Sequence, residues 1–165
     1  MPKTRINVVN CEFMGNEYNM TSGCVFVYSD VVMSSCKFLS FRSGAVFTVS
    51  NDEGDVEIKD CEISKCGLVG IYSQGDEAKQ FILRCKIDNV EGQGIRVHKA
   101  NRAKIQGCEI SKCVTGIEVL SGDPYIIIHS TIHSHTRFYT SFHTRFHTRF
   151  HTLSVIIHSR LSLIQ

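Results

Sequence analysis

The repeat that decides the fold is clearest at Ile58-Lys59-Asp60-Cys61-Glu62-Ile63. Its spacing, an apolar residue three positions before a cysteine and another two positions after it, occurs in five copies. They are Val8-x-x-Cys11-x-Phe13, Met33-x-x-Cys36-x-Phe38, Ile58-x-x-Cys61-x-Ile63, Ile82-x-x-Cys85-x-Ile87 and Ile105-x-x-Cys108-x-Ile110. The cysteines lie 25, 25, 24 and 23 residues apart, and a sixth copy begins at Ile127-x-x-Ser130-x-Ile132. A period of this length is typical of solenoid proteins, in which each repeat stacks on the next.

A second apolar element follows each cysteine after eight to twelve residues. Its copies are Gly23-Cys24-Val25, Gly44-Ala45-Val46, Gly70-Ile71, Gly94-Ile95 and Gly116-Ile117. Both elements alternate apolar and polar residues and are rich in β-branched side chains, which predicts two strands per coil. Clusters such as 51–55 and 121–123 are typical of turns. We therefore expect an all-β, right-handed parallel β-helix of about five coils of 22–25 residues over residues 1–132, because strand crossovers are almost always right-handed.

The leucine-rich repeat is the main alternative fold. Val56-x-Ile58-x-x-Cys61-x-Ile63 also fits its consensus, and the period fits as well. That fold needs a helix or a 3₁₀ segment in the second half of each repeat. Here the second half reads Gly94-Ile95-Arg96-Val97 and Gly116-Ile117-Glu118-Val119, which is typical of a strand. The pattern therefore favours the β-helix.

Charge divides the chain into two compositional parts. Residues 1–123 hold 14 Lys and Arg against 16 Asp and Glu, whereas residues 124–165 hold four Arg, no acidic residue and seven of the eight His. Neither part carries the dense basic patch of a nucleic-acid-binding protein. Because no long apolar run occurs, we expect neither a membrane span nor a signal peptide.

The last 33 residues, 133–165, differ in character from the repeats. His135-Thr136-Arg137-Phe138 recurs at 143–146 and 147–150. Such compositional bias does not specify a packed core. We interpret this segment as a disordered low-complexity tail or as a gene-model artefact rather than as a metal-binding tract.

Stacked coils place equivalent residues above one another, so each position forms a ladder along the solenoid. The five repeat cysteines form one ladder, and their apolar neighbours predict that they point inward. Cys66 and Cys113 follow five residues after a repeat cysteine, at an expected turn. The paired spacing of zinc sites is absent from this pattern, so we interpret these cysteines as reduced core residues and expect no metal and no cofactor. Reduced core thiols favour an intracellular, cytoplasmic compartment.

A charged ladder is expected next to the cysteines, facing solvent. It alternates in sign without exception: Glu12, Lys37, Glu62, Lys86 and Glu109. Opposite charges on neighbouring strands stabilise a sheet by a few tenths of a kcal/mol each. We interpret this ladder as setting the register of the sheet, not as a pair of catalytic acids.

The second strand carries another ladder that is expected to face outward, made of Phe26, Phe47, Tyr72, Arg96 and Glu118. Val25, Val27, Ile71 and Ser73 should then face the core. Three successive exposed aromatic rings would form an apolar strip, and such strips often mark binding surfaces. We predict that Phe26, Phe47, Tyr72 and Arg96 bind a partner. A covering loop or domain is the alternative explanation for these rings.

Candidate catalytic and metal sites are weak. His98 with Arg96 and Asp88 is the one mixed group on the strands, and a single His is more often a surface residue. Asp52, Glu53 and Asp55 could hold a weak Ca²⁺ ion, although a solvated turn explains them better. We therefore assign no catalytic residue.

The coil pattern x-I-x-x-C-x-I…G-I-x-V, over residues 5–132, resembles the right-handed β-helix repeats of the pectin-lyase-like superfamily. More narrowly, it is similar to two eukaryotic intracellular groups, the β-helix F-box-only proteins and the SHC SH2-domain-binding proteins. The resemblance implies a fragment of a longer solenoid that serves as a non-catalytic scaffold, recruiting substrates for ubiquitination or acting in signalling and cell division. A carbohydrate-binding or carbohydrate-active β-helix, such as a polysaccharide lyase or hydrolase, is the alternative.

Overall fold

The computed structural model describes residues 5–16, 22–27, 30–50, 54–75, 79–99, 102–121, 125–132, 137–142 and 154–158. The regular structure of these residues is β-strand throughout, and they contain no helix. Strands one repeat apart pair in parallel, as β4 (Asp30–Ser34) does with β7 (Val56–Lys59). These pairings confirm the predicted parallel β-solenoid and disfavour the leucine-rich repeat.

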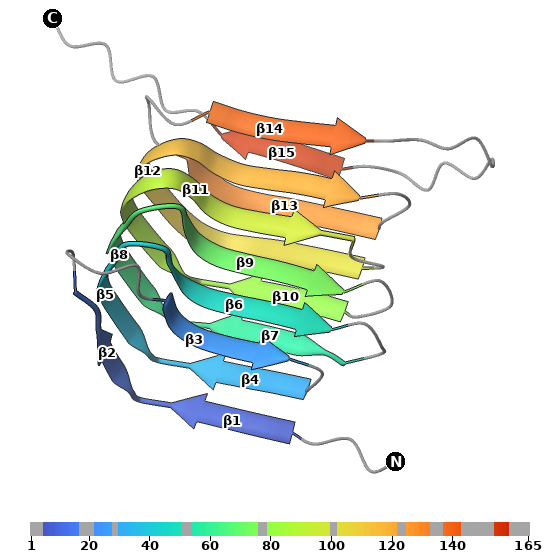
Figure 1. The fold of residues 1–165 in the computed structure, drawn as a ribbon. Coiled ribbons are helices and arrows are strands. Elements are labelled where there is room, and N and C mark those ends of the chain that lie inside the picture. Colours follow the sequence, from blue (N-terminus) through green and yellow to red (C-terminus); the bar gives the residue numbers. More distant parts are fainter. Residues whose placement is uncertain are drawn as a thin grey trace, which may run out of the picture.

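The strands stack as three rows, which Figure 1 shows as two layers that run in opposite directions and a curved edge that joins them. The first row contains β1 (Arg5–Val9), β4, β7, β10 (Lys79–Leu83), the start of β12 (Arg102–Ser121), β13 (Tyr125–Ile132) and β15 (Ser154–His158). The second row contains β2 (Glu12–Met14), β5 (Lys37–Phe41), β8 (Glu62–Cys66), the start of β11 (Lys86–His98) and the middle of β12. The third row contains β3 (Ser22–Val27), β6 (Gly44–Ser50), β9 (Val69–Gly75), the ends of β11 and β12, and β14 (Arg137–Phe142).

Each coil therefore has three strands, not the two predicted from the sequence. The repeat motif bends in its middle, because the residue before each cysteine adopts a left-handed backbone conformation. These corner residues are Asn10, Ser35, Asp60, Arg84 and Gly107, with φ between 50° and 66°. At this conformation the chain turns sharply, so the two apolar residues of one motif belong to different rows.

The interior is filled by one apolar ladder from each side of the coil. In the central coil, Ile58 of the first row, Ile63 of the second and Ile71 of the third are at most 1% exposed. The predicted inward orientation of the repeat cysteines is confirmed: Cys36, Cys61, Cys85 and Cys108 are at most 1% exposed, and Cys11 is half-buried. Cys66 and Cys113 are also buried, at the corner between the second and third rows.

The charged ladder has the predicted register. Lys37 pairs with both Glu12 and Glu62, and Lys86 pairs with both Glu62 and Glu109. The ammonium group of Lys37 lies 3.3 Å from a carboxylate oxygen of Glu62, and both side chains are exposed. Each such pair stabilises the fold little, because water screens exposed charges, but a one-coil slip would bring like charges together.

Two strands of the segment expected to be a tail are described. β14 pairs in parallel with the end of β12, and β15 pairs with β13. Strand pairing thus extends beyond the expected boundary at residue 132. The other residues of 133–165, among them most of the tetrapeptide repeats, lie outside the described residues.

Candidate binding surface on the third row

The outer side of the third row carries a continuous line of contacting side chains. Phe47 of β6 pairs in register with Tyr72 of β9, and their ring centroids are 5.9 Å apart at an angle of 44°. The guanidinium carbon of Arg96 lies 5.9 Å from the centroid of the Tyr72 ring, within the range of a cation–π interaction. Arg96 in turn lies next to Glu118, with 3.0 Å between Nε and a carboxylate oxygen. We call Phe47, Tyr72, Arg96 and Glu118 the outer strip.

The inward neighbours of the outer strip confirm its orientation. Ile71 and Ser73 flank Tyr72 in sequence, and both are fully buried as predicted. The members of the strip are themselves partly buried, and the side chains of Arg96 and Glu118 are 38% and 16% exposed. The contacts along the strip restrict the conformations of these side chains.

Phe26 does not belong to the outer strip, so its predicted position was wrong. It pairs with Thr48, one residue beyond Phe47, and its side chain packs against the core. Val25 and Val27 instead take the register positions of Phe47 and Val49. The shift arises in the first coil, where Gly23 lies opposite Ala45 and not opposite Gly44. Two aromatic rungs therefore remain of the three expected.

Tyr72 also connects the strip to a neighbouring polar ladder. Its hydroxyl donates a hydrogen bond to the side-chain oxygen of Gln74 at 2.6 Å and lies 3.4 Å from Nδ1 of His98. The predicted grouping of His98 with Asp88 does not form, because Asp88 accepts hydrogen bonds from Ser111 and Lys112 in the second row. His98 thus belongs to the surroundings of the outer strip.

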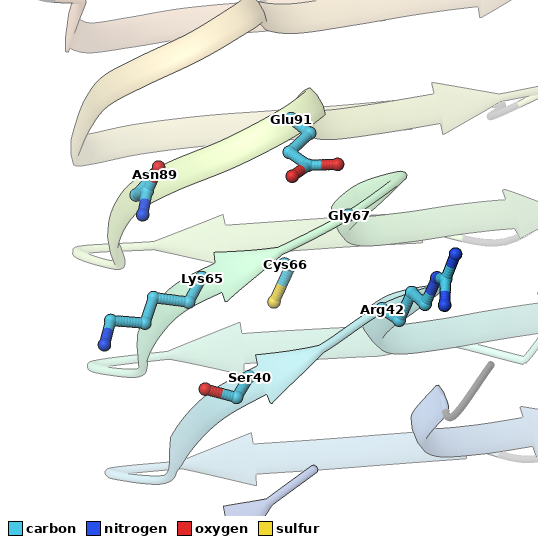
Figure 2. Close-up of a pocket in the computed structure, with 7 residues that line it drawn as sticks. All are labelled: Ser40, Arg42, Lys65, Cys66, Gly67, Asn89 and Glu91. Atoms are coloured by element: carbon cyan, nitrogen blue, oxygen red, sulfur yellow. The ribbon is translucent and has the colours of Figure 1, made fainter. Parts of the chain in front are cut away.

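A polar groove of about 580 Å³ lies beside the strip, at the corner between the second and third rows (Figure 2). Its lining residues are Ser40, Arg42, Lys65, Cys66, Gly67, Asn89 and Glu91. The sequence interpretation missed this groove because its residues come from three coils and share no residue type. An alignment of the coils at the positions four and six residues after each repeat cysteine would have placed most of these lining residues next to one another.

The predicted calcium site lies partly outside the described residues, which include Asp55 but neither Asp52 nor Glu53. A carboxylate oxygen of Asp55 accepts a hydrogen bond from the backbone N–H of Lys79 at 3.2 Å, as a turn residue does. In the described ranges no three His, Cys, Asp or Glu side chains are grouped as metal ligands. The same ranges hold no helix long and apolar enough to cross a membrane.

Comparison with known proteins bears on the fold alone. The family model described as "Right handed beta helix region" matches residues 2–152. No curated protein and no solved structure matches the chain.

Proposed function

Because the chain belongs to the family of right-handed β-helix regions, whose fold serves both enzymes and binding proteins, we propose from its surface that it is a non-catalytic protein-binding scaffold. The observation that carries this proposal is the outer strip. Two aromatic rings and an arginine, residue types that supply much of the energy at protein interfaces, are held side by side on successive rigid strands.

The ionic groups of the strip favour binding over chemistry. Arg96 is paired with Glu118 and stacked on Tyr72, and the Tyr72 hydroxyl is bonded to Gln74. These groups therefore neutralise one another and do not converge on a point where a substrate atom could react. A partly apolar strip of this kind suits the side of a protein partner.

The proposal extends to the cell compartment and to the class of partner. All eight cysteines are free thiols, which suits a reducing intracellular environment. By its resemblance to F-box-only and SHC SH2-domain-binding proteins, the partner would be a substrate for ubiquitination or a component of signalling or cell division.

The test is the loss of binding to an identified partner when one ring is removed. A Phe47→Ser variant should weaken the direct binding of a purified partner by about 2 kcal/mol, roughly thirtyfold in Kd, while the melting temperature stays near that of the parent. Phe81→Ser is the matched control, since Phe81 is a half-buried ring in the first row, between Glu57 and Lys104.

Equal weakening by both variants, or none by either, would defeat the proposal. Binding of a polysaccharide that depends on Phe47, with no protein partner, would favour the carbohydrate-binding alternative. The 44° angle between the two rings argues against that outcome, because they do not form one flat platform for a sugar chain.

A further inference from the structure

The polar groove combines two cations with one carboxylate around an open floor. Cys66 and Gly67 form the floor, with Ser40, Lys65 and Asn89 on one side and Arg42 and Glu91 on the other (Figure 2). We propose that this groove binds a small polar ligand, or a side chain of the same chemistry, that carries a carboxylate next to an N–H or O–H donor. This inference does not depend on the outer strip or its partner.

Gly67 permits a close backbone approach at the floor of the groove. A Cβ atom at Gly67 would lie 1.9 Å from the backbone oxygen of Arg42, so this position cannot carry a side chain without a backbone shift. Arg42 and Glu91 therefore flank a position with no side chain, and their strands lie two strand spacings, about 10 Å, apart. Figure 2 shows Glu91 above Gly67 and Arg42 below it.

Lys65 is set apart from the lysine at the equivalent position of a later coil. Lys112 lies 3.4 Å from a carboxylate oxygen of Asp88, which pairs with Ser111, the residue before Lys112. The residue that pairs with Ser64, before Lys65, is Leu39, and Lys65 makes no ion pair with a described residue. Lys65 is therefore available to an anion from solution, whereas Lys112 is neutralised.

The charge and composition of the lining select the ligand. Arg42 and Lys65 against Glu91 give a net charge of +1, which suits a singly charged carboxylate. A phosphate dianion would be repelled by Glu91, whereas a ligand N–H or O–H could donate a hydrogen bond to it. Among the described residues no aromatic or aliphatic side chain lines the groove, so the ligand should be polar over its length. A volume of about 580 Å³ is ample for one of this kind.

The test uses N-acetylglycine and glucuronate, which pair a single carboxylate with an N–H donor and with O–H donors respectively, and inorganic phosphate as the third probe. Titrations followed by amide NMR at constant ionic strength should show saturable shifts confined to residues 40–42, 65–67 and 89–91 with at least one carboxylate. Lys65→Gln and Arg42→Gln should each raise the dissociation constant about tenfold. Lys112→Gln should leave it unchanged.

The ratio of the dissociation constants of the two carboxylates shows whether the groove prefers an amide or a hydroxyl donor. Three results would overturn the inference: no saturable shift with either carboxylate, tighter binding of phosphate than of both, or equal weakening by Lys112→Gln. Equal weakening by Lys112→Gln would mean that the ligand is attracted only by the overall positive charge of the corner. A folded Lys65→Gln protein is expected, because the Lys65 side chain is exposed and makes no ion pair with the described residues.

Discussion

At the scale of single residues, Gln80 is the least expected side chain of the interior. It is fully buried in the first row, between Val56 and Ala103, and neither end of its amide has a hydrogen-bond partner among the described residues. A buried amide without partners costs about 1–3 kcal/mol. Thr48 and Ser73, the other buried polar side chains of the described interior, avoid this cost through a mutual hydrogen bond of 2.8 Å.

A Gln80→Leu substitution should therefore stabilise the protein. Leucine has a similar size and needs no partner, so we expect the free energy of unfolding to rise by about 1–3 kcal/mol in chemical denaturation. Ile82→Ala, at a fully buried position of the same strand, should lower it by about 2–5 kcal/mol and serves as the control for sensitivity. If Gln80→Leu were destabilising instead, a bound water or a residue outside the described ranges must satisfy the amide.

The buried thiols give the fold a dependence on alkaline pH. Burial raises the pKa of Cys24 and of Cys66 to about 11, from the usual thiol value of 9.0. The folded state then holds these protons more tightly than the unfolded state. The stability they contribute is fully present below pH 9 and is lost as the pH rises through 11.

We therefore expect the melting temperature to fall between pH 9 and 11, and the fall to be smaller in Cys66→Val. Valine suits this position because Val90 occupies it in the next coil. Comparing the two proteins by differential scanning calorimetry isolates the contribution of the Cys66 thiol, because every other ionisable group is common to both. Identical slopes would show that the Cys66 thiol is not linked to folding.

At the scale of the elements, each corner connects two rows, and the glycines at different corners should differ in how well they tolerate substitution. Gly67 lies where the second row passes into the third, and its backbone approaches that of Arg42 closely. Gly107 lies at the other corner, with a φ of 66°, but a Cβ there would meet no atom nearer than the flexible Arg84 side chain at 3.3 Å.

Gly67→Ala should destabilise the protein by about 2 kcal/mol or more, because the backbone must shift to admit the methyl group. Gly107→Asn should change stability by less than about 1 kcal/mol, since asparagine tolerates the left-handed conformation. Equivalent corners already hold Asn10, Ser35 and Asp60 in that conformation. Urea denaturation of the two variants decides the matter, and similar losses at both sites would contradict a role for close backbone approach at Gly67.

The same corners explain which elements the sequence predicts. The cysteine period sets the first two rows, so the inward cysteines and the alternating charges were both predicted correctly. The split of each motif into two strands was missed, because Ser35 and Asp60 take a glycine-like conformation without the glycine that marks one. The predicted alignment of the third row was wrong by one residue at Phe26, because the connection in the first coil is longer than in the second. Ser22 follows Met14 by eight residues, whereas the equivalent Gly44 follows Leu39 by five.

The groove could not be predicted from any single repeat. Its cations, Arg42 and Lys65, stand at different positions of different coils, and Glu91 comes from a third. Only the stacking of coils brings them to one corner. The outer strip was partly predictable, because Phe47, Tyr72 and Arg96 share a ladder position that the spacing of the repeats reveals.

At the scale of the whole molecule, stability should be close to a sum over stacked coils, each of which contacts its neighbours alone. The last coils then matter because they cover the apolar ladders beneath them. β14 pairs with β12 from Thr115 to Ser121, and β15 pairs with β13 from Ile127 to Thr131. Removing these strands would leave two rows with unpaired backbone edges.

Deletion of residues 133–165 should accordingly lower the melting temperature and increase aggregation, because it removes β14 and β15 and uncovers the strands that they pair with. Deletion of residues 159–165 removes no described strand and serves as the control, with an unchanged melting temperature. Circular dichroism of both proteins should remain of the β type, since the coils before residue 133 keep their own pairings. If the long deletion melts at the temperature of the full chain, β14 and β15 add nothing to the fold, and the stabilising solenoid ends near residue 132 as the repeat pattern first predicted. If it melts several degrees lower while the control does not, the tetrapeptide-containing segment acts as the C-terminal cap.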